Sequence, residues 1–274
     1  MVLVSDKQLI TGKNRRVQTS MGMLAEERRM HLVEWTRSAG LVDANEAADK
    51  LAVAVETVRR DLDVLQRRGL LRRVHGGAIA TEKFAHEFTI PERENRSPQE
   101  KQQIADVASK YIPEEGAIIV DGGTTCAALG PYLLDKPNLL VITNSVRLAN
   151  TIAESSTKLY MLAGRVRSTS LSSVGARTVE DLQDLNALVA FIGTNGISND
   201  GTFTAYDTDE ALVKKAMMKN SVEKIAMADQ TKFDSTYPAS FARPKDFDRL
   251  VTTVNAPQKE VDRMTAAGVE VVLA

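Results

Sequence analysis

The residues best suited to binding chemistry form a short loop of small and polar side chains. After an apolar stretch the chain reads Asp121-Gly122-Gly123-Thr124-Thr125. Glycine lets a backbone approach a ligand closely, threonine hydroxyls donate hydrogen bonds, and the N-terminus of a following helix attracts an anion. The loop therefore predicts a cradle for a phosphate. The same residues also suit a tight turn before a capped helix, so the loop alone leaves both interpretations open.

Three later loops offer similar groups. They follow further apolar runs and read Thr143-Asn144-Ser145, Gly164-Arg165 and Gly193-Thr194-Asn195-Gly196. In open α/β proteins the carboxyl ends of the parallel strands meet at one edge of the sheet, and ligands bind there. We therefore expect one composite pocket rather than four unrelated turns.

Seven apolar runs in the second part of the chain must position these loops. They cover residues 117–121, 139–143, 158–164, 188–193, 224–229, 250–254 and 269–274. Runs that are apolar at nearly every position are typical of strands covered on both faces, and helix-like stretches lie between them. The predicted fold class is therefore α/β, with an open α/β domain at its C-terminal side.

A second group of chemically active residues lies nearer the N-terminus. The stretch 57–77 holds six arginines and two aspartates. Guanidinium groups on a helix can donate paired hydrogen bonds to DNA phosphates or to guanine edges in the major groove. A solvated charged face has the same composition, so charge alone does not decide between the two.

The elements around this stretch favour DNA binding. Three helices and a hairpin are expected in turn, over residues 24–37, 43–51, 55–68 and 70–80. Asp43 or Asn45 can cap the second helix, and Gly76-Gly77 favours a tight turn between two short strands. Helix, turn, helix and hairpin in this order predict a winged helix-turn-helix.

Composition limits the other possibilities. The 274 residues suffice for two domains with separate cores. No apolar run approaches the roughly 20 residues that span a membrane, and the first residues lack a signal peptide's apolar core, so we expect a cytoplasmic protein without a membrane partner. A single cysteine, Cys126, and three histidines predict neither a disulfide nor a metal site, and we expect no cofactor.

Charge is distributed unevenly along the chain. Residues 1–80 carry 14 Lys and Arg and 10 Asp and Glu, a net charge of +4. The remainder carries 21 and 26 of these residues, a net charge of −5. The pattern indicates that only the N-terminal part meets a polyanion.

The stretch ETVRRDLDVLQRRGLLRRVHGGA, residues 56–78, resembles the DNA-binding signature of the DeoR family of bacterial regulators. That signature has a TIRRDL-like helix, a leucine-rich segment and an HGG-containing wing. Ala54 stands where relatives usually have a capping serine, a loss that costs about 1 kcal/mol of local stability. The resemblance implies a DNA-binding surface formed by Glu56, Thr57, Arg59, Arg60, Arg67, Arg72, Arg73, His75 and Gly76.

The resemblance continues to about Phe233 through the motifs DGGTT, VITN, LAGRVR, FIGTNG and TKF. It implies an effector-binding domain similar to ribose-5-phosphate isomerase that binds a sugar phosphate. Ala163 departs from the family, which often has glycine there. By position the family pattern assigns effector binding to Asp121, Gly122, Thr124, Thr125 and Asn144, with Lys101 and Lys232 as charge partners.

The loop analysis adds Gly123, Gly164 and Asn195 to this set. Asp207, with the acidic residues that follow it, can bind sugar hydroxyls, and it equally suits a capped, acidic helix start.

The expected domains are an arm or wrongly assigned start (1–22), the winged helix-turn-helix (23–80), a linker (81–96) and the α/β domain (97–274). Pro91 argues against a continuous helix in the linker. Ser97 and Glu100 predict a capping box at the start of the next helix, with Pro98 in its first position.

The resemblance implies a repressor of genes for sugar uptake or breakdown, released from double-stranded operator DNA by a phosphorylated sugar. A single winged helix reads a small surface, so we expect a homodimer or homotetramer. The alternative is a sugar-phosphate isomerase-like enzyme carrying a DNA-binding domain, which needs a carboxylate base such as Asp121. Asn195 stands where the isomerases have a catalytic aspartate, and an amide cannot accept that proton. No catalytic residue is therefore expected.

Overall fold

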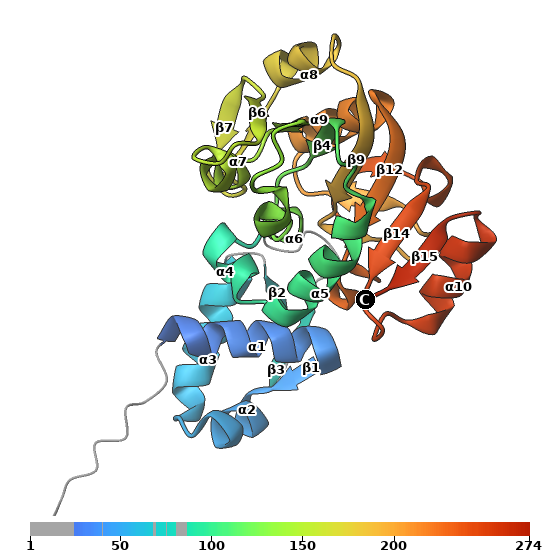
Figure 1. Cartoon of the computed structure of the whole chain (residues 1–274). Coiled ribbons are helices and arrows are strands. Elements are labelled where there is room, and N and C mark those ends of the chain that lie inside the picture. Colours follow the sequence, from blue (N-terminus) through green and yellow to red (C-terminus); the bar gives the residue numbers. More distant parts are fainter. Residues whose placement is uncertain (1–24, 40, 68–69, 75, 81–86) are drawn as a thin grey trace, which may run out of the picture. The chain divides into compact units, whose positions relative to one another are not determined.

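The computed structural model describes residues 25–39, 41–67, 70–74, 76–80 and 87–274. The chain divides into two compact units, Met1–Lys83 and Phe84–Ala274 (Figure 1). Each unit has a hydrophobic core of its own. In the part of the chain that the structure describes, no helix is long and apolar enough to cross a membrane.

The first unit is the expected winged helix-turn-helix. Its elements are α1 (Ala25–Ala39), β1 (Leu41–Asp43), α2 (Ala44–Leu51), α3 (Val55–Arg67), β2 (Leu71–Val74) and β3 (Gly77–Ala80). The three strands form an antiparallel sheet in the order β1-β3-β2. The sequence analysis does not anticipate β1, because three residues between two helices show no periodicity.

Local chemistry explains the two helices of the motif. The Asp43 carboxylate accepts hydrogen bonds from two backbone N–H groups in the first turn of α2, at 2.8 and 3.1 Å. On α3 the apolar residues Val58, Leu62 and Leu65 recur at helical spacing, and all three are buried together with Leu32 of α1.

A buried carboxylate ties α3 to α1. Asp61 is 3% exposed, and its two oxygens accept from Arg28 Nε at 2.6 Å and Arg29 Nε at 2.8 Å. Asp61, one of the two aspartates in the basic stretch, is therefore a structural residue.

The second unit is built on a seven-stranded parallel sheet. In spatial order the strands are β15 (Glu270–Leu273), β14 (Arg249–Thr252), β12 (Ser221–Met227), β9 (Ala187–Gly193), β4 (Gly116–Val120), β5 (Leu139–Thr143) and β6 (Lys158–Met161). Every neighbouring pair is parallel. Each of the seven apolar runs contributes one of these strands, which confirms the predicted open α/β fold.

Helices cover both faces of the sheet. Alternate residues of β4 enter different cores: Ile118 and Val120 pack on one face and Ile119 on the other. The first face is covered by α5 (Pro98–Ala108), α6 (Thr124–Ala127) and α7 (Val146–Ile152). The second face is covered by α8 (Ala176–Leu182), α9 (Thr208–Lys219) and α10 (Gln258–Ala266).

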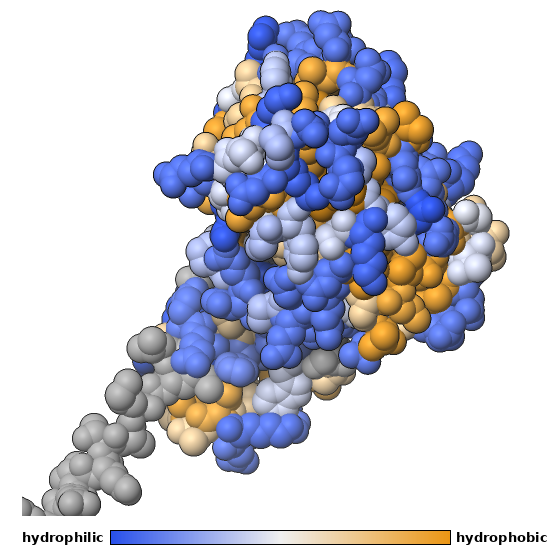
Figure 2. Space-filling model, in the orientation of Figure 1, coloured by the Kyte–Doolittle hydropathy of each residue, from blue (hydrophilic) through white to orange (hydrophobic). Residues whose placement is uncertain are grey.

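The strand order reverses at β4. From β4 the chain proceeds outward to β5 and β6, and then returns to the other side of β4 to form β9, β12, β14 and β15. The connections after β4 and β9 therefore leave in opposite directions and open a crevice at the carboxyl ends of these strands. β6 and β15 remain as sheet edges, and apolar surface gathers around β15, where Val254 and Leu273 are exposed (Figure 2).

Short elements complete the second unit. They are the hairpin β7 (Arg165–Arg167) and β8 (Ser172–Val174), the sheet β10 (Gly196–Ile197), β11 (Phe203–Ala205) and β13 (Ala239–Ala242), and the 3-10 turns Ser109–Tyr111, Gly130–Leu133, Gln230–Lys232 and Pro244–Asp246.

The expected linker contains a helix, α4 (Ile90–Glu94). Pro91 lies in its first turn, where a missing N–H costs nothing, and Thr89 with Glu92 forms a capping box. The described residues 87–96 belong to the second compact unit. The capping box expected at the start of α5 is wrong, because Ser97 has φ 49° and its side chain makes no cap hydrogen bond.

The Asp61 contacts predict that Asp61→Ala destabilises the first unit by about 3–5 kcal/mol, because it leaves buried guanidinium charge without its carboxylate. Urea unfolding of the full chain, followed through the fluorescence of the single tryptophan, Trp35, measures this unit alone. Asp49→Ala is the matched control, since Asp49 is exposed on α2. Equal unfolding midpoints for the two variants would contradict the structural role of Asp61.

Candidate functional site

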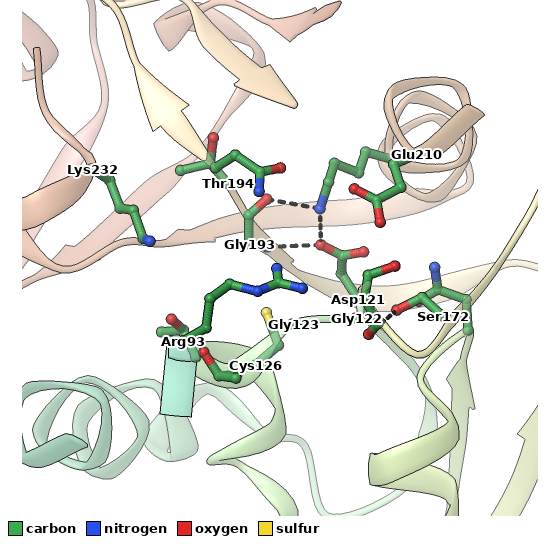
Figure 3. Close-up of a pocket in the computed structure, with 16 residues that line it drawn as sticks. Arg93, Asp121, Gly122, Gly123, Cys126, Ser172, Gly193, Thr194, Glu210 and Lys232 are labelled. Carbon is green, nitrogen blue, oxygen red and sulfur yellow. Dashed lines mark hydrogen bonds and ion pairs between the residues drawn. The ribbon is translucent and has the colours of Figure 1, made fainter. Parts of the chain in front are cut away.

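A pocket lies in the crevice where the strand order reverses (Figure 3). The loops after β4, β5 and β9 line it, together with residues of α4, α9, the β7–β8 hairpin and the Gln230–Lys232 turn. The expected effector ligands that line it are Asp121, Gly122, Gly123, Thr124, Thr125, Asn144, Asn195 and Lys232.

A buried ion pair forms one wall of the pocket. Lys214 Nζ contacts Asp121 Oδ2 and donates to the Gly193 carbonyl at 3.0 Å, while the Gly193 N–H donates to Asp121 Oδ2 at 3.0 Å (Figure 3). Asp121 is 2% and Lys214 6% exposed. Burial alone would lower the pKa of Lys214, but the carboxylates of Asp121 and Glu210 outweigh it and raise that pKa. The Asp121 charge is thus compensated inside the protein.

The Gly122 backbone lies against the β7–β8 hairpin. A Cβ at Gly122 would come within 2.0 Å of Ser172 Oγ, so only glycine fits this contact. Beside it, Asn144 Nδ2 donates to the Ser173 carbonyl at 3.2 Å. Asn144 Oδ1 is buried and accepts no hydrogen bond from the described residues, and Ser170 Oγ also has no partner among them. These two atoms can bond to hydroxyl groups of a ligand.

Two cations enter the pocket from the other side. Arg93 extends from α4 and lies between Lys232 and Asp121 (Figure 3). Arg93 Nη2 donates to the Thr169 carbonyl at 2.7 Å, whereas Arg93 Nε is buried with no partner in the described part of the chain. Burial lowers the pKa of Arg93 and of Lys232, because both cations are partly removed from water. An anion bound between them would compensate that cost.

A helix follows the loop, as expected, but it is short. α6 has only four residues, so few peptide dipoles align behind the loop. The loop still offers close backbone approach at Gly123, which has φ 102°. Direct hydrogen bonds and side-chain charge are therefore the main interactions that this loop and its neighbours offer to an anion.

Three expected effector ligands do not line this pocket. Lys101 is buried, and its Nζ donates to the carbonyls of Arg93 and Arg96; burial lowers its pKa to about 8. Gly164 lies in a turn with φ 141°, where a Cβ would clash with Thr178.

Asp207 is the third of these residues. Its carboxylate accepts from the backbone N–H groups of Asp209 and Glu210 at 2.9 and 3.1 Å, and it pairs with Arg167 at 3.3 Å. The structure thus places Asp207 as a helix cap, the structural alternative that the sequence leaves open.

Sequence reasoning misses several lining residues. Arg93 lies in the segment taken for a linker, and no local motif marks it. Glu210 and Lys214 are four residues apart on α9, a spacing that puts both on one helix face, but nothing in the sequence places that face at the pocket. Ser170 and Ser172 enter through a hairpin too short to recognise.

The expected DNA-binding residues lie on α3 and the wing. Arg59 and Arg60 are exposed on α3, with side chains 52% and 80% accessible. Glu56, Arg67, Arg72 and Gly76 are also exposed, and Thr57 is half-buried; His75 lies outside the described residues. Arg73 differs, because it bonds to Asp63 Oδ1 and the Gly77 carbonyl, both at 3.0 Å, and so holds the hairpin to α3.

No group of three His, Cys, Asp or Glu side chains within the described ranges could hold a metal ion. The thiol of Cys126 is buried beside the pocket, and burial raises its pKa.

The chain is similar to curated transcriptional regulators over most of its length. It is 29% identical to the HTH-type transcriptional regulator GlpR of Haloferax volcanii over 91% of this chain and 98% of that protein. It is 26% identical to the glycerol-3-phosphate regulon repressor of Escherichia coli K12, over 89% of this chain and 96% of that protein. It is 31% identical to the uncharacterized HTH-type transcriptional regulator YulB of Bacillus subtilis, over 84% of this chain and 89% of that protein.

Among solved structures, a D-ribose-5-phosphate isomerase in complex with phospho-erythronic acid covers 50% of this chain and 55% of its own, with a TM-score of 0.37 and 18% identity. The full-length sorbitol operon regulator SorC of Klebsiella pneumoniae covers 73% and 88%, with a TM-score of 0.32 and 9% identity.

Two family models match the two units. The DeoR-like helix-turn-helix domain matches residues 28–84, and the DeoR C terminal sensor domain matches residues 96–253. The second match alone covers more than half of the chain. The chain is therefore a member of the DeoR family of DNA-binding transcriptional regulators.

Proposed function

We propose that this regulator represses genes for the uptake or breakdown of a sugar and that a sugar phosphate, bound in the pocket, releases it from operator DNA. The observation that carries the proposal is that the cations Arg93 and Lys232 line the same pocket as buried polar atoms with no protein partner among the described residues. Similar regulators support it, among them a glycerol-3-phosphate regulon repressor and a putative aga operon repressor of Escherichia coli.

The phosphate belongs beside these two cations. Arg93 and Lys232 supply positive charge, and Gly122, Gly123, Thr124 and Thr125 line the same pocket. A guanidinium binds phosphate well because its N–H groups match the geometry of two phosphate oxygens. The sugar hydroxyls belong beside the polar atoms without protein partners.

Asn144 Oδ1 and Ser170 Oγ lack protein partners among the described residues, and Asn195 offers a further amide. Pairing such buried polar atoms with a ligand discriminates strongly between ligands, because a molecule without matching groups leaves them unsatisfied. These contacts would select one sugar phosphate among several.

DNA binding is assigned to the exposed arginines of α3 and the wing. We expect two or more copies of this chain to bind repeated half-sites, because one α3 reads only a few base pairs. The apolar surface around edge strand β15, with Val254 and Leu273 exposed, supports assembly through the sensor unit. We expect the protein to work in the cytoplasm, where operator DNA lies.

Turnover of the sugar phosphate is the competing function. Isomerisation needs a carboxylate free to accept a proton from carbon. Asp121 instead contacts Lys214 and the Gly193 N–H, and the Asn195 amide accepts from the Tyr206 backbone N–H at 3.3 Å. These contacts favour binding over catalysis.

A thermal-shift series with fructose 6-phosphate, glucose 6-phosphate and glycerol 3-phosphate tests the effector class. A compound present at 100 times its dissociation constant should stabilise the protein by about 2.7 kcal/mol. The unphosphorylated sugars and glycerol serve as controls and should have little effect. Stabilisation that did not depend on the phosphate group would refute a phosphate site.

Arg59→Ala and Arg60→Ala should each weaken operator binding by about 1–3 kcal/mol if the side chain contacts a base, without unfolding the first unit. Fluorescence anisotropy with labelled promoter DNA measures this, and binding of the unaltered protein should fall steeply with salt. Arg177→Ala, which removes an exposed arginine from α8, is the control. Wild-type operator affinity in both α3 variants would show that α3 does not contact the DNA.

Thr125→Val should weaken effector binding by about 1.5–3 kcal/mol, because it keeps the side-chain shape but removes a hydroxyl donor to a charged group. DNA binding should persist, and release should need roughly 10 to 100 times more sugar phosphate. Titration of the repressor–operator complex measures the midpoint, with Thr151→Val on α7 as control. An unchanged midpoint would exclude Thr125 from the site.

A further inference from the structure

Arg93 differs from the other residues that line the pocket in its position along the chain. The other lining residues lie at or beyond Asp121, within the sheet and its connections. Among the described residues, Arg93 alone comes from the segment that follows the DNA-binding unit along the chain. A ligand that binds Arg93 therefore acts directly on the segment 87–96.

Besides Arg93, this segment is attached to the sensor unit at three points, one of which is the ion pair between Glu94 of α4 and Arg147 of α7. At its start, both oxygens of Glu87 bond to the Arg167 guanidinium of β7, and both side chains are largely buried. At its end, Lys101 of α5 donates to the carbonyls of Arg93 and Arg96. Glu87 thus holds the part of the chain before α4, and Lys101 holds the part after it.

The guanidinium of Arg93 is incompletely bonded between these points. One nitrogen donates to the Thr169 carbonyl at 2.7 Å, but the buried Nε has no acceptor in the described residues. A buried donor without a partner is unfavourable, and a phosphate in the pocket would supply the missing acceptor. Effector binding therefore favours the arrangement in which α4 is held at the pocket.

We propose that α4 transmits the state of the pocket to the DNA-binding unit: Arg93 binds the phosphate, and the Glu87–Arg167 pair passes the fixed position of α4 to the preceding chain. The inference rests on the proposed function. It satisfies the general requirement that effector and operator communicate only through states that they bind differently.

Three single variants separate ligand binding from transmission. Arg93→Met removes the phosphate ligand but keeps an apolar stem. Glu87→Gln weakens the attachment to Arg167, which keeps ion pairs with Asp207 and Glu210 and so is not left unpaired. Arg96→Met is the matched control, because it removes an arginine from the same segment that does not line the pocket.

Calorimetry with inorganic phosphate, and with the sugar phosphate that gives the largest thermal shift, measures binding without DNA. Arg93→Met should weaken the binding of both compounds by about 10- to 100-fold. Glu87→Gln and Arg96→Met should bind both nearly as the unaltered protein does. Hydrogen exchange should show that the sugar phosphate protects the backbone amides of α4 in the unaltered protein and not in Arg93→Met.

The ratio of operator dissociation constants with and without saturating sugar phosphate measures transmission. In the unaltered protein we expect a ratio of about 5 to 150, the common range for such coupling. In Glu87→Gln it should fall toward 1, and in Arg96→Met it should stay high.

Wild-type phosphate affinity in Arg93→Met, or a wild-type ratio in Glu87→Gln, would overturn the inference while leaving the proposed function intact. Failure of the unaltered protein to bind any of these phosphates would overturn both. The two failures are distinguishable because only the second is seen before any variant is made.

Discussion

The sensor pocket depends on the buried ion pair between Asp121 and Lys214. Asp121 directly follows β4, Gly193 ends β9 and Lys214 lies on α9, so the pair joins the two halves of the sheet across the point where the strand order reverses. Burying either charge alone would be costly, and the Gly193 peptide supplies the remaining hydrogen bonds. Asp121 and Lys214 thus compensate each other. The other charged lining residues are Arg93, Lys232 and Glu210, and Glu210 pairs with Arg167.

Much of the fold can be predicted from the sequence because its main elements are long or uninterrupted. Each central strand needs apolar residues on both faces, and that requirement appears as a continuous run such as 117–121 or 188–193. Helix α3 shows its buried stripe just as clearly. Strands of two or three residues, such as β1 and β7, leave no such pattern because long-range pairing rather than local sequence forms them.

The residues of the pocket also differ in whether a local sequence pattern predicts them. Residues that directly follow a strand, such as Asn144 and Asn195, can be assigned to one sheet edge from their position in the sequence alone. Arg93 reaches the pocket only through tertiary packing of α4, so no local pattern identifies it. Lys101 and Asp207 illustrate the opposite error. Lys101 donates to backbone carbonyls and Asp207 caps α9, and the sequence does not distinguish such structural roles from ligand binding.

The strand order has a consequence for how such sensors diversify. Each wall of the pocket comes from a separate connection, while the strands beneath are fixed by two cores that share β4. Ser170, whose hydroxyl has no partner among the described residues, can therefore change without disturbing the framework, whereas Asn144 and Asn195 also hold backbone groups in place. A single scaffold can in this way acquire a preference for another phosphorylated metabolite through a few substitutions at the sheet edge, with its internal charge balance intact.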